Sequence, residues 1–373
     1  MTWPTRPLAD VADFCLGKML DQRKNKGTLL PYLANVNVRW GQFDLDDLRE
    51  MRFEAAEMER YGVKYGDIVM CEGGEPGRCA IWKDQMPGMM IQKALHRIRP
   101  HECLDHRFLF YSFLHTGKKG GFSPLFTGAT IKHLPRQKLA KVEVPVPRLE
   151  IQLKIADILS AYDDLIENNR RRIALLERAA REIYREWFVR LRFPGHEHSK
   201  IVDNVPEGWE RTALRNICQL KYGKALKAEH RVRGEYPVYG SSGIIGTHDK
   251  ARVQGPGIII GRKGNVGSVY WSDGDFCPID TVYFLEPSAV TLYFYYVLQN
   301  VDFINTDVAV PGLNRNFAYS REILVPSDQV RDAFDDIAKP LHDQISLLRK
   351  ENKSLSLARD LLLPRLMDGR ISV

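Results

Sequence analysis

The sequence predicts an α+β protein with two similar mixed α/β domains, joined by two long helices that pack as an antiparallel coiled coil with an internal pseudo-twofold repeat. Two observations lead to this fold class. The motifs of the first half return in the same order in the second half, and each half changes from short apolar segments to a heptad pattern. The 373 residues suffice for two domains of ordinary size. We expect five segments: a first globular domain (1–147), a first long helix (148–193), a linker (194–206), a second globular domain (207–326) and a second long helix (327–373).

Matched residues keep one order along the two halves. Trp3 reappears 206 positions later as Trp209, and Leu176 reappears 179 positions later as Leu355. The separation only falls between these two pairs, through Gly17-Lys18 with Gly223-Lys224, Gly74 and Gly77 with Gly264 and Gly267, Gly128 with Gly312, and Val144-Pro145 with Val325-Pro326. Chance matches would not keep this order. The chain is therefore a tandem duplication, and its first half carries 27 extra residues.

The first part of each half is predicted to form strands. It is rich in glycine, proline and aromatic residues, and its apolar runs are short. Examples are Asp67–Met70 and Gly257–Ile260, which turn residues bound on both sides. The aromatic run Phe108–Phe113 and its counterpart Tyr293–Tyr296 are interpreted as core rather than as a platform for stacking bases.

The second part of the first half has the seven-residue period of a coiled coil. One row consists of Ile155, Tyr162, Asn169, Leu176 and Ile183, and its companion of Ile158/Leu159, Leu165/Ile166, Ile173, Ala179/Ala180 and Trp187. Prolines precede the helix, and Pro194-Gly195 are predicted to end it. Asn169 falls on the seam, where one polar residue commonly fixes the register of the pairing.

The second half repeats this helix. Its rows are Phe334, Leu341, Leu348, Leu355 and Leu362, with Ile337, Ile345, Ala358 and Leu366 as companions. Ser327 or Asp328 is the expected N-cap and Gly369 the expected stop. Kinks or breaks are expected at Pro340 and Pro364. The two helices most simply bury their seams against each other; the alternative is that each packs only on its own half.

Composition excludes several classes of protein. No stretch approaches the roughly 20 apolar residues of a membrane helix, and the N-terminus lacks the apolar core of a signal peptide. The six cysteines show no closely spaced pair of the zinc type, so we expect reduced thiols in a cytoplasmic protein. A formal charge of +7 is compatible with a nucleic-acid partner without requiring one.

No catalytic, metal or cofactor motif is recognisable. The glycine-rich run Gly261–Gly267 lacks the Gly-Lys-Ser/Thr ending of a phosphate loop and leads into a strand-like segment. His196-Glu197-His198 is interpreted as a solvated linker rather than a metal site. No nucleophile elbow of the Gly-x-Ser-x-Gly type occurs. We expect a non-catalytic chain.

Basic and amide residues in the predicted loops favour double-stranded DNA as the partner. Arginine and asparagine can pair bidentately with base edges, whereas lysine meets phosphates as a point charge. The candidates for base readout are Lys26, Arg39, Gln42 and Lys132 in the first half, with Ser242, Arg262, Asn265 and Arg315 in the second. Asn314 is a further DNA-binding candidate. The candidates for phosphate contacts are Lys24, Lys118, Lys119, Lys224 and Lys263.

Two alternatives remain open at this level. The chain could instead be a two-headed protein–protein scaffold whose basicity is incidental. The run Arg170–Arg172 on the first long helix could face solvent, a partner protein or phosphates, and the sequence does not rank these roles.

With these features, the chain resembles the specificity subunit of type I restriction–modification systems over essentially its whole length. The stretches that carry the resemblance are Ile155–Phe188, Tyr236–Gly243 and Arg359–Leu366. The resemblance implies that each globular domain is a target-recognition domain reading one part of a bipartite, asymmetric DNA sequence. It also implies that the helices set the spacing and dock two copies of a methyltransferase subunit. S-adenosylmethionine and ATP are then expected on the methyltransferase and restriction subunits, and no cofactor on this chain.

Overall fold

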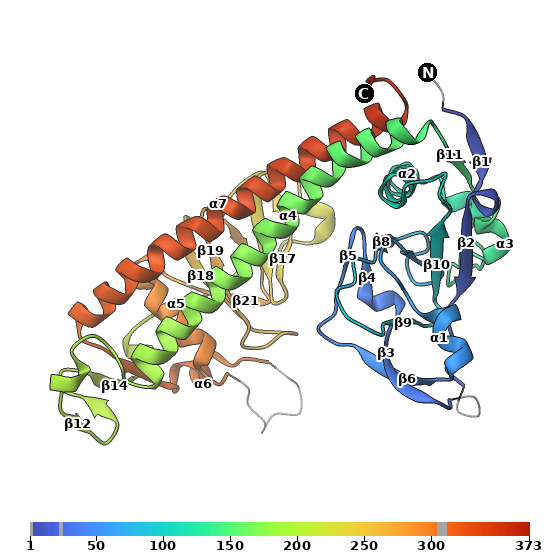
Figure 1. The fold of residues 1–373 in the computed structure, drawn as a ribbon. Coiled ribbons are helices and arrows are strands. Elements are labelled where there is room, and N and C mark those ends of the chain that lie inside the picture. Colours follow the sequence, from blue (N-terminus) through green and yellow to red (C-terminus); the bar gives the residue numbers. More distant parts are fainter. Residues whose placement is uncertain (1–2, 22–24, 304–311) are drawn as a thin grey trace. The chain divides into compact units, whose positions relative to one another are not determined.

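The computed structural model describes residues 3–21, 25–303 and 312–373. The chain divides into two compact units (Figure 1): Met1–Asn168 with Asn352–Val373, and Asn169–Glu351. Each unit contains one globular domain and a part of both long helices. The globular domains are called the first head (residues 3–145) and the second head (residues 201–325) below.

The first head is built on a four-stranded antiparallel sheet with the order β2-β10-β7-β8. A three-stranded sheet, β6-β3-β9, accompanies it, with β3 antiparallel to β6 and parallel to β9. The strands are β1 (Thr5–Pro7), β2 (Ala12–Leu16), β3 (Thr28–Leu33), β4 (Val38–Arg39), β5 (Gln42–Phe43), β6 (Arg49–Phe53), β7 (Ile68–Cys71), β8 (Cys79–Ile81), β9 (Met90–Ile91), β10 (Leu95–Pro100) and β11 (Glu143–Pro145). The helices are α1 (Ala55–Tyr61), α2 (His106–Lys118) and α3 (Arg136–Leu139).

The second head repeats this topology. Its four-stranded sheet has the order β15-β21-β18-β19, and its three-stranded sheet, β17-β16-β20, again has one antiparallel and one parallel pairing. The strands are β12 (Ile201–Val202), β13 (Val205–Pro206), β14 (Glu210–Ala213), β15 (Leu220–Tyr222), β16 (Tyr236–Gly240), β17 (Gly243–His248), β18 (Gly257–Gly261), β19 (Val269–Ser272), β20 (Cys277–Pro278), β21 (Val282–Leu285) and β22 (Glu322–Val325), and the helices are α5 (Leu292–Asn300) and α6 (Arg315–Tyr319). The predicted duplication is therefore a duplication of structure.

The same short ladder leads into each long helix. In the first head, β1 pairs with β11 immediately before α4 (Leu149–Tyr184). In the second head, β14 pairs with β22 immediately before α7 (Asp328–Met367). The helices are 36 and 40 residues long, and α4 continues as a π-helical turn at Arg185–Val189. Regular helix thus stops before Pro194, which the sequence suggested as its end.

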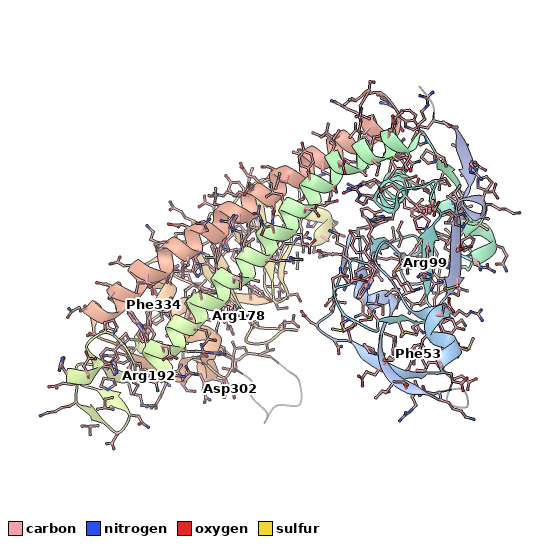
Figure 2. All side chains as sticks on the ribbon, in the orientation of Figure 1. Phe53, Arg99, Arg178, Arg192, Asp302 and Phe334 are labelled. Atoms are coloured by element: carbon pink, nitrogen blue, oxygen red, sulfur yellow. The ribbon has the colours of Figure 1, made fainter. Side chains whose placement is uncertain are left out.

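The seams of α4 and α7 are buried against each other and against the heads, which combines the two packing arrangements considered from sequence. In one unit, Ile155 and Leu159 of α4 share a core with Leu363 and Leu366 of α7 and with α2. Figure 2 labels Phe334 of α7, which lies in the other core with Tyr184 of α4, Phe188 of the π-helical turn after α4, and Tyr293 of α5. The aromatic runs of α2 and α5 are largely buried, as predicted.

Two expectations for the second helix are wrong. Helix α7 is unbroken through Pro340 and Pro364. Pro340 is exposed, so its missing N–H lies on the solvent side, and Pro364 lies in the last turn, where few helical hydrogen bonds follow. Ile337 is 42% exposed, and the seam position belongs to Ala338, which is 1% exposed.

The ends of α7 agree with the predicted signals. The carbonyl of Ser327 accepts the N–H of Arg331 at 3.0 Å, which places Ser327 at the N-cap. Gly369 has a φ of 66° just beyond the helix, the left-handed conformation that favours glycine.

His342 of α7 makes the second unit sensitive to acid. Its Nε2 lies 2.7 Å from the hydroxyl of Tyr296, and its ring packs on Trp271 and Tyr295. Burial lowers the pKa of His342 to about 4. Because the unfolded histidine binds its proton near pH 6.5, the folded state binds fewer protons between these two values.

We therefore expect His342 to contribute on the order of 2–3 kcal/mol to the free energy of unfolding. This contribution should be fully present above pH 6.5 and should be lost as the pH drops toward 4. Denaturant titrations at a series of pH values check this. The variant His342→Gln should lose this part of the pH dependence, whereas the exposed His198→Gln should keep it. Identical pH profiles for His342→Gln and the unmodified chain would contradict the assignment.

Candidate nucleic-acid interface

In the second head, the turn between β18 and β19 presents three of the predicted DNA-binding residues. Gly264 and Gly267 adopt φ values of 82° and 78°, which allow the chain to reverse within a few residues. The turn is closed by the N–H of Gly267, which donates to the carbonyl of Gly261 at 2.9 Å. Lys263 and Asn265 are exposed at this turn, and Arg262 is half-buried beside it.

Two further loops join the turn. Asn265 Nδ2 donates to Ser242 Oγ at 3.3 Å, which links the turn to the β16–β17 loop. The N–H of Leu313 donates to the carbonyl of Arg262 at 2.8 Å, which links it to the start of α6. Asn314 caps α6 through its side-chain oxygen, and Arg315 is exposed in the first turn. The fold thus brings six predicted residues together in a second-head cluster, namely Ser242, Arg262, Lys263, Asn265, Asn314 and Arg315.

Sequence reasoning missed the aromatic residue of this cluster. Tyr222, at the end of β15, is 46% exposed, and the guanidinium carbons of Arg262 and Arg315 each lie 5.1 Å from its ring centroid. The ring of Tyr283 lies 4.9 Å away, and burial together with the Tyr222 hydroxyl raises the pKa of Tyr283 to about 12. Tyr283 therefore stays protonated and donates to the carbonyl of Leu313 at 3.0 Å. No motif signals Tyr222, because the contact joins strand β15 to two distant loops.

Lys224 is exposed on the segment after β15. Its backbone N–H donates to the carbonyl of Pro278 at 3.1 Å, which places it beside β20.

The predicted residues of the first head are more scattered. Lys26 is exposed before β3, and Lys132 is exposed next to His133, which bridges to Gly73 in the β7–β8 turn. Arg39 and Gln42 face each other on the β4–β5 hairpin. The Arg39 guanidinium donates to the carbonyl of Val36 at 2.5 Å, so it is partly committed to its own loop. Lys24 lies outside the described residues.

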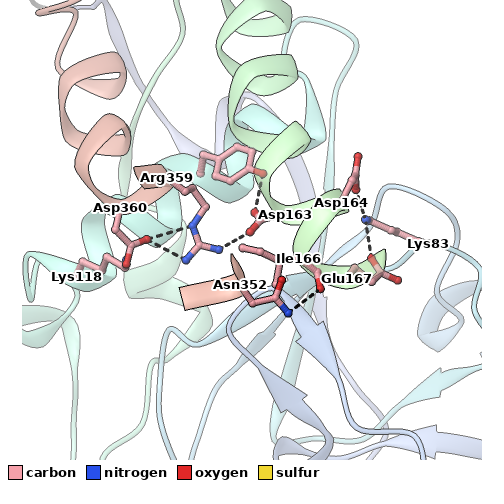
Figure 3. A network of polar contacts seen from close by, with 10 residues as sticks. Lys83, Lys118, Asp163, Asp164, Ile166, Glu167, Asn352, Arg359 and Asp360 are labelled. Carbon is pink, nitrogen blue, oxygen red and sulfur yellow. Dashed lines mark hydrogen bonds and ion pairs between the residues drawn. The ribbon is translucent and has the colours of Figure 1, made fainter. Parts of the chain in front are cut away.

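Lys118 and Lys119, predicted to contact phosphates, form ion pairs with Asp360 of α7 and with Asp368 just beyond its end. Lys118 Nζ lies 2.5 Å from Asp360, and Lys119 Nζ lies 3.2 Å from Asp368. Figure 3 shows Lys118 and Asp360 within a polar network in which Arg359 binds both Asp360 and Asp163 of α4. The C-terminal end of α2 packs against the long helices, so the lysine charges are balanced there.

The two heads hold their matching turns in the same way. In the first head, the N–H of Leu134 donates to the carbonyl of Glu72 at 2.7 Å. In the second head, the equivalent bond from Leu313 to Arg262 is 2.8 Å long. Glu72 and Arg262 are therefore structurally equivalent residues with opposite charges.

The side chains around these turns also differ in character. At the first-head turn, Glu72 is hydrogen-bonded to His133 at 3.0 Å, and Glu75 forms an ion pair with Arg78 at 2.8 Å. The second-head turn presents Arg262, Lys263 and Asn265 at the corresponding places. The two heads therefore share the backbone of this turn but differ in its side chains. They cannot offer the same hydrogen-bond pattern to a ligand.

Among the described residues, neither a candidate metal site nor a candidate membrane-spanning helix is present. Among them, no group of three or more histidine, cysteine, aspartate or glutamate side chains is placed to hold a metal ion. In the same part of the chain, no helix is both long and apolar enough to span a membrane.

Comparison with known proteins identifies the class. The model of the type I restriction modification DNA specificity domain matches residues 1–178 and again residues 206–355, so the chain belongs to this family and carries its domain twice. The family resemblance, the fold class and the role of a non-catalytic DNA-recognition subunit are confirmed.

Individual relatives agree with this class. The chain is 23% identical over 340 residues to the specificity subunit of the type I restriction enzyme MjaIX of Methanocaldococcus jannaschii, covering 83% of this chain and 78% of that protein. It is 26% identical over 167 residues to the MjaVIII specificity subunit of the same organism, over 44% and 38% of the two chains. The crystal structure of the type I S subunit from M. genitalium has the same fold, with a TM-score of 0.59 at 22% identity, over 98% of this chain and 96% of that one.

The ion pair of Lys119 leads to a testable distinction. If Lys119 serves the packing of α2 on α7, Lys119→Ala should lower the free energy of unfolding by at most about 1 kcal/mol, as for exposed ion pairs. DNA affinity should then keep its dependence on salt. A phosphate contact would instead reduce the log–log salt slope by about 1. Denaturant titration and binding at several salt concentrations, with exposed Lys200→Ala as control, decide between the two roles. We expect the unchanged slope.

Proposed function

We propose that this specificity subunit reads a bipartite, asymmetric target in double-stranded DNA, with one head for each half-site. The observation that carries the proposal is that the two heads share one frame and differ at the turn that holds Glu72 in one and Arg262 in the other. The backbone hydrogen bonds that the two heads share favour a common function. The different side chains at the turn favour two different half-sites. In this proposal, methyl transfer and cleavage belong to partner subunits.

The second-head cluster has the chemistry of base readout. Arg262, Asn265 and Arg315 offer donors that fit purine edges in the major groove, and Lys263 is exposed beside them for a phosphate. The residues of the cluster come from loops that are far apart in the chain. A protein–protein scaffold with incidental basicity gives no reason for these residues to lie together. In the first head, Lys26, Gln42 and Lys132 remain candidates on separate loops.

The long helices are proposed to dock two copies of a methyltransferase subunit that binds S-adenosylmethionine, and through this complex an ATP-driven restriction subunit. Both helices expose apolar side chains one turn apart: Leu149 and Leu153 on α4 are 45% and 37% exposed, and Leu357 and Leu361 on α7 are 63% and 55% exposed. Such rows on otherwise polar helices are typical of protein interfaces. A DNA-modifying complex of this kind would work in the cytoplasm.

The DNA-binding part of the proposal is tested by salt and by one variant. Affinity should fall steeply with salt, with a log–log slope of about −0.9 for each phosphate contacted. Arg315→Ala should cost about 1–3 kcal/mol and relax the preference at one base of one half-site. A chain that binds no DNA at low salt would instead support the protein–protein scaffold. A uniform loss of affinity for every sequence would contradict the base-reading role of Arg315.

The docking part is tested on α7. Leu361→Asp places a charge on the exposed apolar row and should weaken binding of the methyltransferase subunit by about tenfold or more, because a buried charge without a partner is costly. Isothermal titration with the purified subunit measures this. Val202→Asp, on the exposed β12–β13 hairpin, is the matched control and should bind normally. Equal affinity of both variants would contradict the proposed surface.

A further inference from the structure

We propose that Tyr222 is a positioning residue that holds Arg262 and Arg315 for the recognition of guanine in the half-site read by the second head. This inference rests on the proposed function, since it assumes that the second head contacts DNA. It adds the class of base that the head selects and a residue that the sequence did not single out.

The geometry fixes Arg262 from two sides. Its guanidinium carbon lies 5.1 Å from the Tyr222 centroid and 5.8 Å from that of Tyr283, within the range of cation–π attraction. Its Nη1 donates to the carbonyl of Asp280 at 2.9 Å. These contacts hold the guanidinium group before any ligand arrives.

Arg315 approaches the same ring from another element. Its guanidinium carbon is also 5.1 Å from the Tyr222 centroid, and its backbone is set by the Asn314 cap of α6. The two guanidinium groups at this exposed ring repel each other. The site therefore favours a ligand with hydrogen-bond acceptors, which would offset the two positive charges. Attraction to the ring face offsets part of that repulsion.

Guanine is the base that matches such a site. Its major-groove edge presents two acceptors, N7 and O6, and arginine pairs with both through two parallel N–H groups. An arginine that is already stacked on an aromatic ring loses less side-chain entropy when it binds than a freely rotating one. Tyr222 would therefore contribute to selectivity without touching a base.

The first head lacks this assembly and serves as an internal control. The N–H of Gly17 donates to Leu95 as the N–H of Gly223 donates to Val282, which makes Leu16 the counterpart of Tyr222. The counterpart of Arg262 is Glu72, and Arg136, at the start of α3, lies over Phe14 at 5.2 Å. A change at Tyr222 should therefore leave the first half-site unaffected.

The experiment uses the full chain in complex with its methyltransferase subunit and the motif that this complex selects from random double-stranded DNA. We expect guanine in the second half-site, and replacing that guanine with 7-deazaguanine should weaken binding of the unmodified protein by about 10- to 100-fold, because N7 is lost. Tyr222→Ala should reduce the preference for guanine at the same position by about tenfold, whereas Tyr222→Phe, which keeps the ring, should retain it. Arg315→Lys keeps the positive charge but loses the two parallel N–H groups of the guanidinium group. It should therefore behave like Tyr222→Ala.

The outcomes separate this inference from the proposed function. Retention of the first half-site preference in Tyr222→Ala shows that the variant is folded and bound. If Tyr222→Ala keeps the preference for guanine, or if its affinity falls equally for all sequences, Tyr222 does not position Arg262 and Arg315. A second half-site without guanine, or one insensitive to 7-deazaguanine, overturns the inference while the two-head function stands. If the unmodified complex selects no motif, the proposed function itself fails, and this inference with it.

Discussion

The whole structure depends on the apolar seam along which α4 and α7 face each other, because the same side chains also complete the core of each head. Phe334 of α7 packs edge-on against Phe188, in the π-helical turn after α4, at 5.1 Å and against Tyr296 of α5 at 6.0 Å. The other unit closes in the same manner around Leu159 and Leu363. Neither head can be separated from the helices without exposing this surface, so each head is fixed to the pair that carries it.

The architecture that the two heads share is compatible with the proposal that they read different half-sites. The sheets, the ladders into the long helices and the hydrogen bonds that hold the β7–β8 and β18–β19 turns are the same in both heads. The side chains at these turns differ, from the hydrogen bond between Glu72 and His133 in the first head to the two arginines beside Tyr222 in the second. Specificity can therefore change at the turns without cost to the core, since exposed turn residues contribute little to packing.

The architecture was accessible from sequence because it depends on periodicity and order, which a single chain displays. The repeat, the two heptad segments, the Ser327 cap and the Gly369 stop follow from local patterns. The expected breaks at Pro340 and Pro364 were wrong because a proline's effect depends on which side of the helix it occupies. Local patterns do not carry that information for a helix whose packing is unknown.

The site was accessible only in part. Residue type and loop position indicated Arg262, Asn265 and Arg315, and the fold brings them together. Lys118 and Lys119 looked the same in sequence, yet they pair with Asp360 and Asp368, residues more than 240 positions away. The sequence did not indicate Tyr222. Its contact with Arg262 and Arg315 joins three segments that are far apart in the chain.

The most direct test of this account is selection from a random double-stranded DNA library by the unmodified chain bound to its methyltransferase subunit. The account predicts a split motif, with two unequal halves separated by a gap of fixed length and no sequence preference. A single contiguous motif would contradict the claim that both heads read DNA. The absence of any enriched sequence, from a complex shown to be folded and assembled, would contradict DNA recognition altogether.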